Sequence, residues 1–270
     1  MQDRVTLMCF FASYTLAFAL ELLHLRLGRP LLRWLAVAAG SAGLLAHTLY
    51  LIAKQPPLIW QFSWMLFVAW VLAIFYLTGA VHYRRLTWGV FVLPLVLGLL
   101  ALGVLLGRPP ADQKGLWQEE MPRLWGPVHA VLILLATVGL CVAFLASLMY
   151  LLQARRLRTK ALPGQGLRLL SLERLEAMNR RAITLAFPLL TAGVVAGGVI
   201  LARGSEAVSW TDLRVVSTLI LWCVFALLMY LRFGHHLRGR QVAFLTIAAF
   251  FMLLCCLALA HPLPQGGMEP

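Results

Sequence analysis

Eight long apolar stretches, separated by shorter polar segments, run along this chain. Each holds about 20 apolar residues, the length that a helix rising about 1.5 Å per residue needs to cross roughly 30 Å of hydrocarbon. Backbone groups in lipid find no water partner, so each stretch is predicted to be helical. The stretches occupy residues 5–25, 31–53, 58–81, 87–107, 126–152, 181–202, 213–233 and 241–260. We therefore expect an all-α fold, a polytopic membrane bundle of about eight transmembrane helices that forms one integral membrane domain over residues 1–270.

The composition of the chain favours a membrane location. Of its 270 residues, 61% are hydrophobic and 12% are charged, whereas about a quarter of the residues in a soluble domain are charged. A soluble core cannot hide that much apolar surface, so the lipid bilayer is the expected surrounding. The first stretch begins just after Asp3 and Arg4, whose charges cancel, and no A-x-A site follows it. We expect it to be a retained helix rather than a signal peptide.

Basic residues are distributed unevenly between the two ends of the predicted helices. Assigning the loops alternately to two sides places 16 Lys and Arg residues on one side and 7 on the other, while the acidic residues number 3 and 7. Because basic residues mark the cytoplasmic side, both termini are expected on the outer, periplasmic side of a bacterial inner membrane. The net charge of +13 is then a topology signal, and we expect no nucleic-acid partner.

Two of the predicted loops are long. The outer loop at 108–125 carries Trp117 and Trp125, and it is either an interfacial aromatic belt or a ligand-contacting loop. The inner loop at 153–180 ends in an amphipathic pattern that predicts a short helix on the inner leaflet. Its basic residues either bind anionic lipid or a soluble partner, or reflect topology alone.

The histidines fall into two groups. Those at inner helix ends stand beside arginines, where imidazole reaches headgroups and water: His24, His82, His235 and His236. The others lie toward the outer side, with His47 inside the second stretch, His129 in the first turn of the fifth and His261 at the end of the eighth. An ionisable side chain within or at the lip of a span is a functional candidate by default. The alternative is that each outer histidine donates a hydrogen bond to a neighbouring helix.

The outer histidines have the chemistry of haem ligands. A neutral imidazole nitrogen is a common axial ligand of haem iron, and two such nitrogens can bind its opposite faces. His129 and His261 both lie at outer helix ends, so they are the candidate pair of metal ligands. Haem propionates need guanidinium partners, and Arg123, Arg203 and Arg214 lie on the same side. Spacing alone leaves haem, zinc and no ligand open.

Motifs of other site chemistries are absent from the sequence. It contains no H-E-x-x-H, G-x-S-x-G, P-loop or G-x-G-x-x-G pattern. Gly193, Gly197 and Gly198 show the small-xxx-small spacing typical of closely packed membrane helices. Glu21 is the only acidic residue deep in a span, and one carboxylate does not make a proton relay.

Four segments, in this order, resemble a known family. They are Ala46-His47-Thr48-Leu49-Tyr50, Gly126-Pro127-Val128-His129-Ala130, Leu172-Glu173-Arg174-Leu175 with Ala186-Phe187-Pro188-Leu189-Leu190-Thr191-Ala192-Gly193, and Tyr230-Leu231-Arg232 with Leu237-Arg238-Gly239-Arg240-Gln241-Val242-Ala243-Phe244-Leu245. The third is similar to a G-F-P-L-L-T-x-G run, and the fourth to a W-R-G-(K/R)-(K/R)-A-A-x-L signature. With these segments on an eight-helix plan, the chain resembles the cytochrome c assembly (CcsA/HemX-type) membrane proteins, especially the small YpjD-like members.

The resemblance implies a protein that holds haem near the outer membrane face. In the full-length members of the family, the haem is then passed to apocytochrome c. His129 looks like the first external haem ligand of the family, and His261 or His47 is the expected second ligand. Trp210 is expected to pack near the haem ring, with Arg123 beside the propionates.

The chain departs from the family pattern at two places. Haem-presenting members carry a Trp-rich outer loop ending W-D-P-K-E, where this chain reads Ser209-Trp210-Thr211-Asp212-Leu213-Arg214. Tyr230 stands where the family has a histidine. These departures imply an accessory haem-binding or assembly factor rather than an enzyme, with other cytochrome c assembly proteins or apocytochrome c as partners. The alternative is a haem-free membrane scaffold or regulator of haem metabolism that acts through its basic cytoplasmic loop.

Overall fold

The computed structural model is all-helical over the residues that it describes. These are residues 2–54, 63–83, 86–106, 125–159, 167, 169–203, 213–234 and 239–259. They contain no strand, and their helices are α1 (Gln2–Leu27), α2 (Pro30–Lys54), α3 (Ser63–His82), α4 (Gly89–Leu106), α5 (Trp125–Arg158), α6 (Leu172–Arg203), α7 (Leu213–Gly234) and α8 (Gly239–Leu259). Each helix falls on one of the predicted stretches, so the predicted fold class is confirmed.

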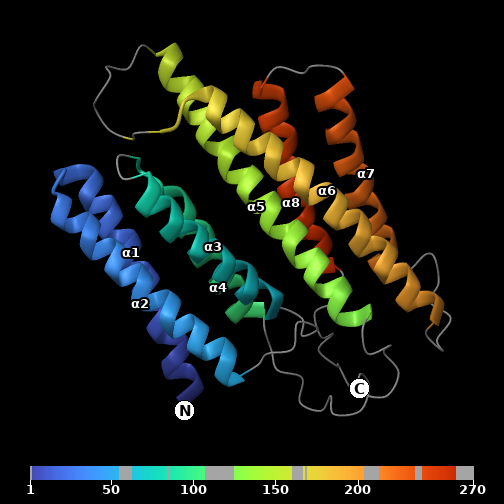
Figure 1. The fold of residues 1–270 in the computed structure, drawn as a ribbon, viewed down its shortest axis with the longest axis horizontal. Helices are drawn as coiled ribbons and strands as arrows, with labels where there is room; N and C mark the ends of the chain where they lie inside the picture. The colour runs from blue at the N-terminus through green and yellow to red at the C-terminus, as the bar shows by residue number, and fades with distance from the viewer. Residues whose placement is uncertain are drawn as a thin grey trace, which may run out of the picture. The chain divides into compact units, whose positions relative to one another are not determined.

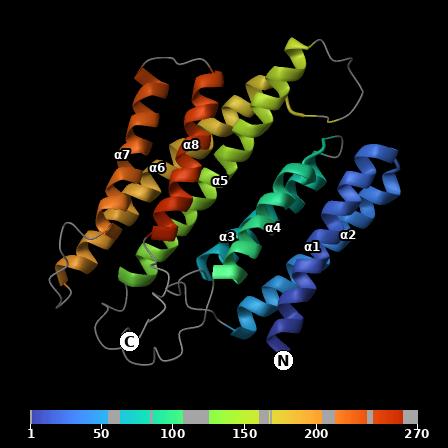
Figure 2. The same cartoon turned by 180° about the vertical axis from the view of Figure 1, so that it is seen from behind.

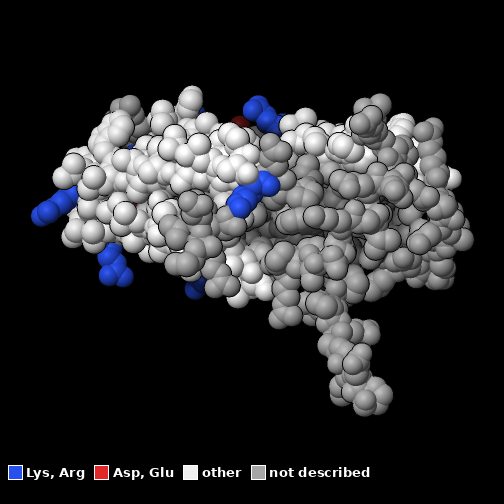
Figure 3. Space-filling model, turned by 90° about the horizontal axis from the view of Figure 1, so that it is seen from below, with Lys and Arg blue, Asp and Glu red and all other residues white. Residues whose placement is uncertain are grey.

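Six of the described helices are long and apolar enough to cross a membrane. They are α1, α2, α3, α5, α6 and α7, while α4 and α8 contribute the shorter apolar stretches Gly89–Leu105 and Gly239–Cys255. Large apolar side chains such as Leu45, Leu105 and Leu185 are exposed, and the described part of the face in Figure 3 is mostly uncharged. A surface of this kind is expected where lipid rather than water surrounds the helices, so this is a multi-pass membrane protein.

The segment between α5 and α6 differs from the sequence prediction. The described residues of 153–180 form no separate short helix, since α5 continues to Arg158 and α6 begins at Leu172. The two helices have 34 and 32 residues, which at about 1.5 Å per residue is longer than a hydrocarbon core of roughly 30 Å. Their polar ends therefore extend past the predicted spans. Arg, Leu and Glu are good helix formers, so neither helix has a local reason to end at the membrane boundary.

The helices pack as two compact units, Met1–Pro110 with Leu151–Leu175 and Ala111–Tyr150 with Glu176–Pro270. In the first unit α1 runs antiparallel to α2 and α3 lies beside α4, while α1 also contacts α4 and α2 contacts α3 (Figure 1). In the second unit α7 lies against α8, and α5 and α6 run beside them (Figure 2). The single integral membrane domain expected from the sequence stays a prediction.

Glycines that face aromatic rings bring the helices of the first unit together. On α2, an added Cβ at Gly40 would lie 2.7 Å from the ring of Tyr76 on α3, and one at Gly43 would lie 3.0 Å from the ring of Tyr14 on α1. Lipid is as apolar as a leucine side chain, so helix association inside a membrane depends on such close packing rather than on the hydrophobic effect.

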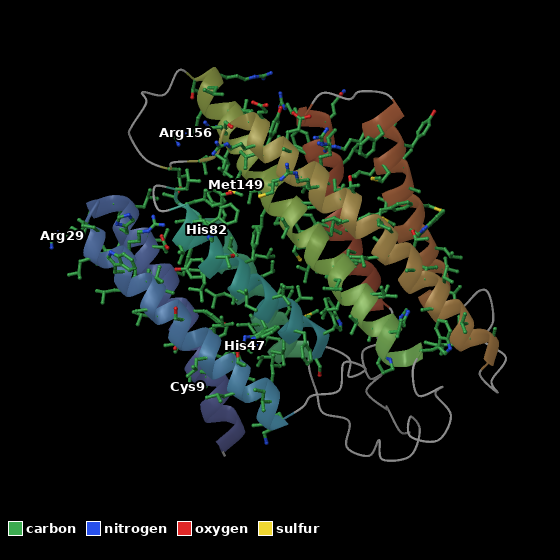
Figure 4. The ribbon with its side chains drawn as sticks, in the orientation of Figure 1. Cys9, Arg29, His47, His82, Met149 and Arg156 are labelled. Atoms are coloured by element: carbon green, nitrogen blue, oxygen red, sulfur yellow. The ribbon has the colours of Figure 1, made fainter. Side chains whose placement is uncertain are left out.

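The two ends of the first unit differ in polarity. Arg29 and His82 lie at one end, whereas His47 lies toward the other (Figure 4). The turn between α1 and α2 uses Gly28 at a φ of 66°, which only glycine adopts without strain. In the same turn His24 Nδ1 lies 2.8 Å from the carbonyl oxygen of Arg29. His24 and His82 thus lie at a basic end of the unit, as the sequence predicts for the inner side.

The closest glycine contact of the first unit gives a stability test. An added Cβ at Gly79 would lie 2.1 Å from Trp88 Nε1, which donates a hydrogen bond to the carbonyl oxygen of Phe75 at 3.3 Å. We expect Gly79→Ala to displace the indole and lower the free energy of unfolding by about 1–3 kcal/mol. SDS titration of the detergent-solubilised protein, followed by circular dichroism, measures the change. Gly98→Ala is the matched control, because an added Cβ there meets nothing within 4 Å. Equal stability of the two variants would contradict this packing.

Candidate functional site

His129 lies in the first turn of α5. The helix opens with Trp125-Gly126-Pro127, and proline suits a first turn because its missing N–H would have no intrahelical partner there. The His129 ring is partly buried and faces α6 within the second unit, where its Nδ1 lies 2.7 Å from the carbonyl oxygen of Gly193. From the sequence, His129 could bind a ligand or donate a hydrogen bond to a neighbouring helix. In the structure its Nδ1 does bond to a neighbouring helix, α6.

That hydrogen bond assigns the two ring nitrogens of His129 to different tasks. A carbonyl oxygen can only accept, so Nδ1 must carry the proton. In a neutral imidazole the other nitrogen, Nε2, then has a free lone pair. Metal-ligating histidines commonly show this arrangement, with one nitrogen held by a carbonyl or carboxylate and the other on the metal. His129 therefore has the chemistry of a ligand that is already oriented.

Two glycines of α6 make room for this contact. An added Cβ at Gly197 would lie 3.1 Å from His129 Cε1 and 3.2 Å from its Nδ1, and one at Gly193 would lie 2.6 Å from Ile133 Cδ1. The close helix packing predicted from the glycine spacing is confirmed for these two positions. Gly198 differs, because an added Cβ there meets nothing within 4 Å. Gly197 is thus part of the surface of α6 against which the His129 ring packs.

His47 lies in the first unit and is completely buried. Its Nδ1 is 3.4 Å from the hydroxyl of Tyr14, and Phe10 stacks on its ring with centroids 4.4 Å apart and an angle of 7° between the planes. Its Nε2 has no hydrogen-bond partner within the described part of the chain. A buried polar atom without a partner is unusual and costs free energy. His47 therefore offers a nitrogen to a ligand, but a ligand reaches it only if neighbouring helices move apart.

The other predicted site residues lie outside the described residues. These are His261, Trp210 and Arg123. The pairing of His129 with His261 therefore stays a prediction, as does the packing of Trp210 against a haem ring. Among the residues that the structure does describe, no group of three or more His, Cys, Asp or Glu side chains is arranged to hold a metal ion.

A buried polar cluster that the sequence did not predict is centred on Asn179 of α6. Asn179 Nδ2 lies 3.1 Å from the carbonyl oxygen of Ala143 and 2.9 Å from Ser147 Oγ, both on α5, and 3.3 Å from Thr246 Oγ1 on α8. Arg232 of α7 donates to Asn179 Oδ1. One amide thus joins all four helices of the second unit. The sixth span was predicted to begin at residue 181, so Asn179 was assigned to a loop and was not considered as a buried residue.

Glu21 holds the same kind of position in the first unit. Its side chain is only 3% exposed and accepts a hydrogen bond from the hydroxyl of Tyr76 on α3 at 3.2 Å. An added Cβ at Gly89, where α4 begins, would lie 2.8 Å from the carboxyl carbon of Glu21. Arg33 of α2 donates to the carbonyl oxygen of Ala80 on α3 at 2.6 Å. Glu21 is the acidic residue that the sequence places deep in a span, and in the structure it is buried and bonded to a residue of a neighbouring helix.

The buried pair Tyr14 and His47 can be tested by replacing both members with phenylalanine. We expect the free energy of unfolding of the Tyr14→Phe/His47→Phe variant to equal or exceed the wild-type value, because an unpartnered buried polar group costs about 1–3 kcal/mol. SDS titration monitored by circular dichroism gives the difference. His47→Ala is the contrasting variant and should lose about 2 kcal/mol or more, since it leaves a cavity beside Phe10. Marked destabilisation of the double variant would instead make the weak 3.4 Å hydrogen bond a structural one.

Comparison with known proteins places these residues in a family. A family model described as Cytochrome C assembly protein matches residues 60–262, which include His129, Gly193 and Gly197 but not His47. The cytochrome c biogenesis protein CcsA of Gloeobacter violaceus is 25% identical over an alignment of 296 positions, gaps included, which covers 89% of this chain and 87% of that protein.

Other relatives match over shorter regions. The cytochrome c biogenesis protein CcsA of a Picosynechococcus species is 37% identical over 106 residues, covering 38% of this chain and 31% of the relative. The CcsA protein of Parasynechococcus marenigrum is 27% identical over an alignment of 154 positions, gaps included, which covers 49% of this chain and 50% of the relative. The family match extends over more than half of the chain, and the helices have the length and composition of membrane spans. The chain therefore belongs to the cytochrome c assembly protein family and is a membrane protein of cytochrome c assembly.

Proposed function

We propose that this protein binds haem near the outer face of the membrane, and that Nε2 of His129 would be a ligand of the haem iron. The observation that carries the proposal is the 2.7 Å hydrogen bond between His129 Nδ1 and the carbonyl oxygen of Gly193, which leaves Nε2 with its lone pair. Haem would supply an iron that binds imidazole nitrogens and propionates that bind cationic side chains. His129 has the donor atom and the orientation for the first of these tasks.

The remaining parts of the site are proposed from the sequence. His261 is the preferred second ligand, since it ends the eighth predicted span on the same side, and His47 is the other candidate. Arg123 would pair with a propionate, and Trp210 would pack beside the ring. Nε2 of His47 has no partner among the described residues, but its ring is already stacked on Phe10, and this favours His261.

The role in the cell follows from the family and from the departures in the outer loop. Relatives carry the name cytochrome c biogenesis protein CcsA, and we propose that this chain is an accessory factor of that process rather than an enzyme that attaches haem. Its partners would be the lipid bilayer, other cytochrome c assembly proteins or apocytochrome c. It would lie in the inner membrane of a bacterium with both termini in the periplasm, as the distribution of basic residues indicates.

Haem binding is tested by the absorption spectrum of protein purified from haem-replete cells. We expect a Soret band that is lost or strongly reduced in His129→Ala, because this substitution removes a ligand nitrogen. His82→Ala is the matched control and should keep the band, since His82 lies at the basic end of the first unit (Figure 4) and its Nδ1 is bonded to the carbonyl oxygen of Thr78 in its own helix. A His261→Ala variant identifies the second ligand.

Two results would contradict the proposal. A wild-type protein without a Soret band would favour the haem-free scaffold that acts through its basic cytoplasmic loop. A band of wild-type intensity in His129→Ala would show that haem is bound at another site.

The proposed orientation is tested with reporter fusions. Alkaline phosphatase is active only after export, so we expect it to be active when it is fused after residue 270 or within the outer loop at 108–125. The same reporter placed between α5 and α6, at residue 163, should be inactive because that loop carries the excess of basic residues. Phosphatase activity measured in intact cells tests the orientation. Activity at residue 163 and none at the other two fusion sites would invert the topology and place His129 on the cytoplasmic side.

A further inference from the structure

The absence of a side chain at Gly197 controls where the His129 ring can lie. The ring approaches α6 so closely that a Cβ at Gly197 would lie 3.1 Å from Cε1 and 3.2 Å from Nδ1. Contacts this short are tighter than nine in ten of the contacts that real Cβ atoms make. A methyl group at this position would move the ring by a few tenths of an ångström, which is enough to weaken a hydrogen bond.

The position of the ring decides which nitrogen carries the proton. In water, neutral histidine prefers to carry its proton on Nε2, and that form has no lone pair at Nε2. Here the carbonyl oxygen of Gly193 reverses the preference, because it accepts a proton from Nδ1 at 2.7 Å. The hydrogen bond also makes Nε2 a stronger donor of its electron pair to a metal. Carbonyl partners have the same effect on other metal-ligating histidines.

We propose that Gly197 is a positioning residue for His129. Its missing Cβ lets the ring reach the carbonyl of Gly193, which holds the proton on Nδ1 and keeps Nε2 available as the ligating atom. The part of this inference that concerns a bound ligand rests on the proposed haem function. The part that concerns the tautomer rests on the contacts of α5 and α6 alone.

The tautomer is tested by nitrogen NMR of the full chain labelled with 15N-histidine in lipid nanodiscs. The His129 signal is assigned by its loss in His129→Gln. We expect wild-type His129 to carry its proton on Nδ1, and Gly197→Ala to shift the population toward the Nε2-protonated form. Gly198→Ala is the matched control, because it adds the same methyl group one residue away, where nothing lies within 4 Å. Wild-type His129 protonated on Nε2 would overturn the inference without recourse to any variant.

Haem titration of the same proteins gives the second measurement. Loss of a group that orients a metal ligand typically weakens metal affinity about 10–100-fold, so we expect a haem Kd raised by that factor in Gly197→Ala and unchanged in Gly198→Ala. Wild-type affinity in a folded Gly197→Ala variant would overturn the inference. A wild-type protein with the proton on Nδ1 but no affinity for haem would overturn the proposed function and leave the tautomer assignment supported.

Discussion

Close contact between helix backbones is the constraint on which the rest of this structure depends. Lipid surrounds the helices with material as apolar as their own side chains, so burial of apolar surface gives little net drive for association. What remains is tight packing and hydrogen bonding. The described helices meet this need with glycines, among them Gly40 and Gly43 of α2, against which the rings of Tyr76 and Tyr14 lie. In the second unit, an added Cβ at Gly139 of α5 would lie 2.9 Å from the Cβ of Ala186 on α6.

Each unit adds to this packing a buried polar residue that forms hydrogen bonds from one helix to another. Glu21 in the first unit accepts a hydrogen bond from Tyr76 on α3, and Asn179 in the second unit has partners on the other three helices. A polar group in an apolar interior is costly unless it is bonded, so each residue favours the one arrangement of helices that satisfies it. Arg232 extends the cluster around Asn179, because it also donates to the carbonyl oxygen of Glu176 at 3.1 Å.

The candidate haem site follows from the same packing. His129 would be an ordinary histidine at a helix end if α6 lay farther from α5. Because α6 carries glycines at positions 193 and 197, its backbone comes close enough for a carbonyl to bind the imidazole directly. The glycines that bring α6 close to α5 thus also orient the imidazole of His129. His47 illustrates the contrast, since its ring is enclosed by Phe10 and Tyr14 and its Nε2 has no partner in the part of the chain that is described.

The sequence by itself determined the helices, the membrane class and the family. Hydropathy is a local property, so each of the eight stretches could be located from its own residues, and the family motifs marked His129 as a candidate. Only the tertiary structure decided which nitrogen of His129 is free, because the carbonyl that decides it lies 64 residues away along the chain. The same holds for Asn179, whose neighbours in sequence are typical of a loop, and for the polar ends of α5 and α6, which hydropathy placed outside the helices. Contacts between distant residues leave no local pattern, and this is why the sequence marked His129 as a candidate ligand but not the contacts that orient its ring.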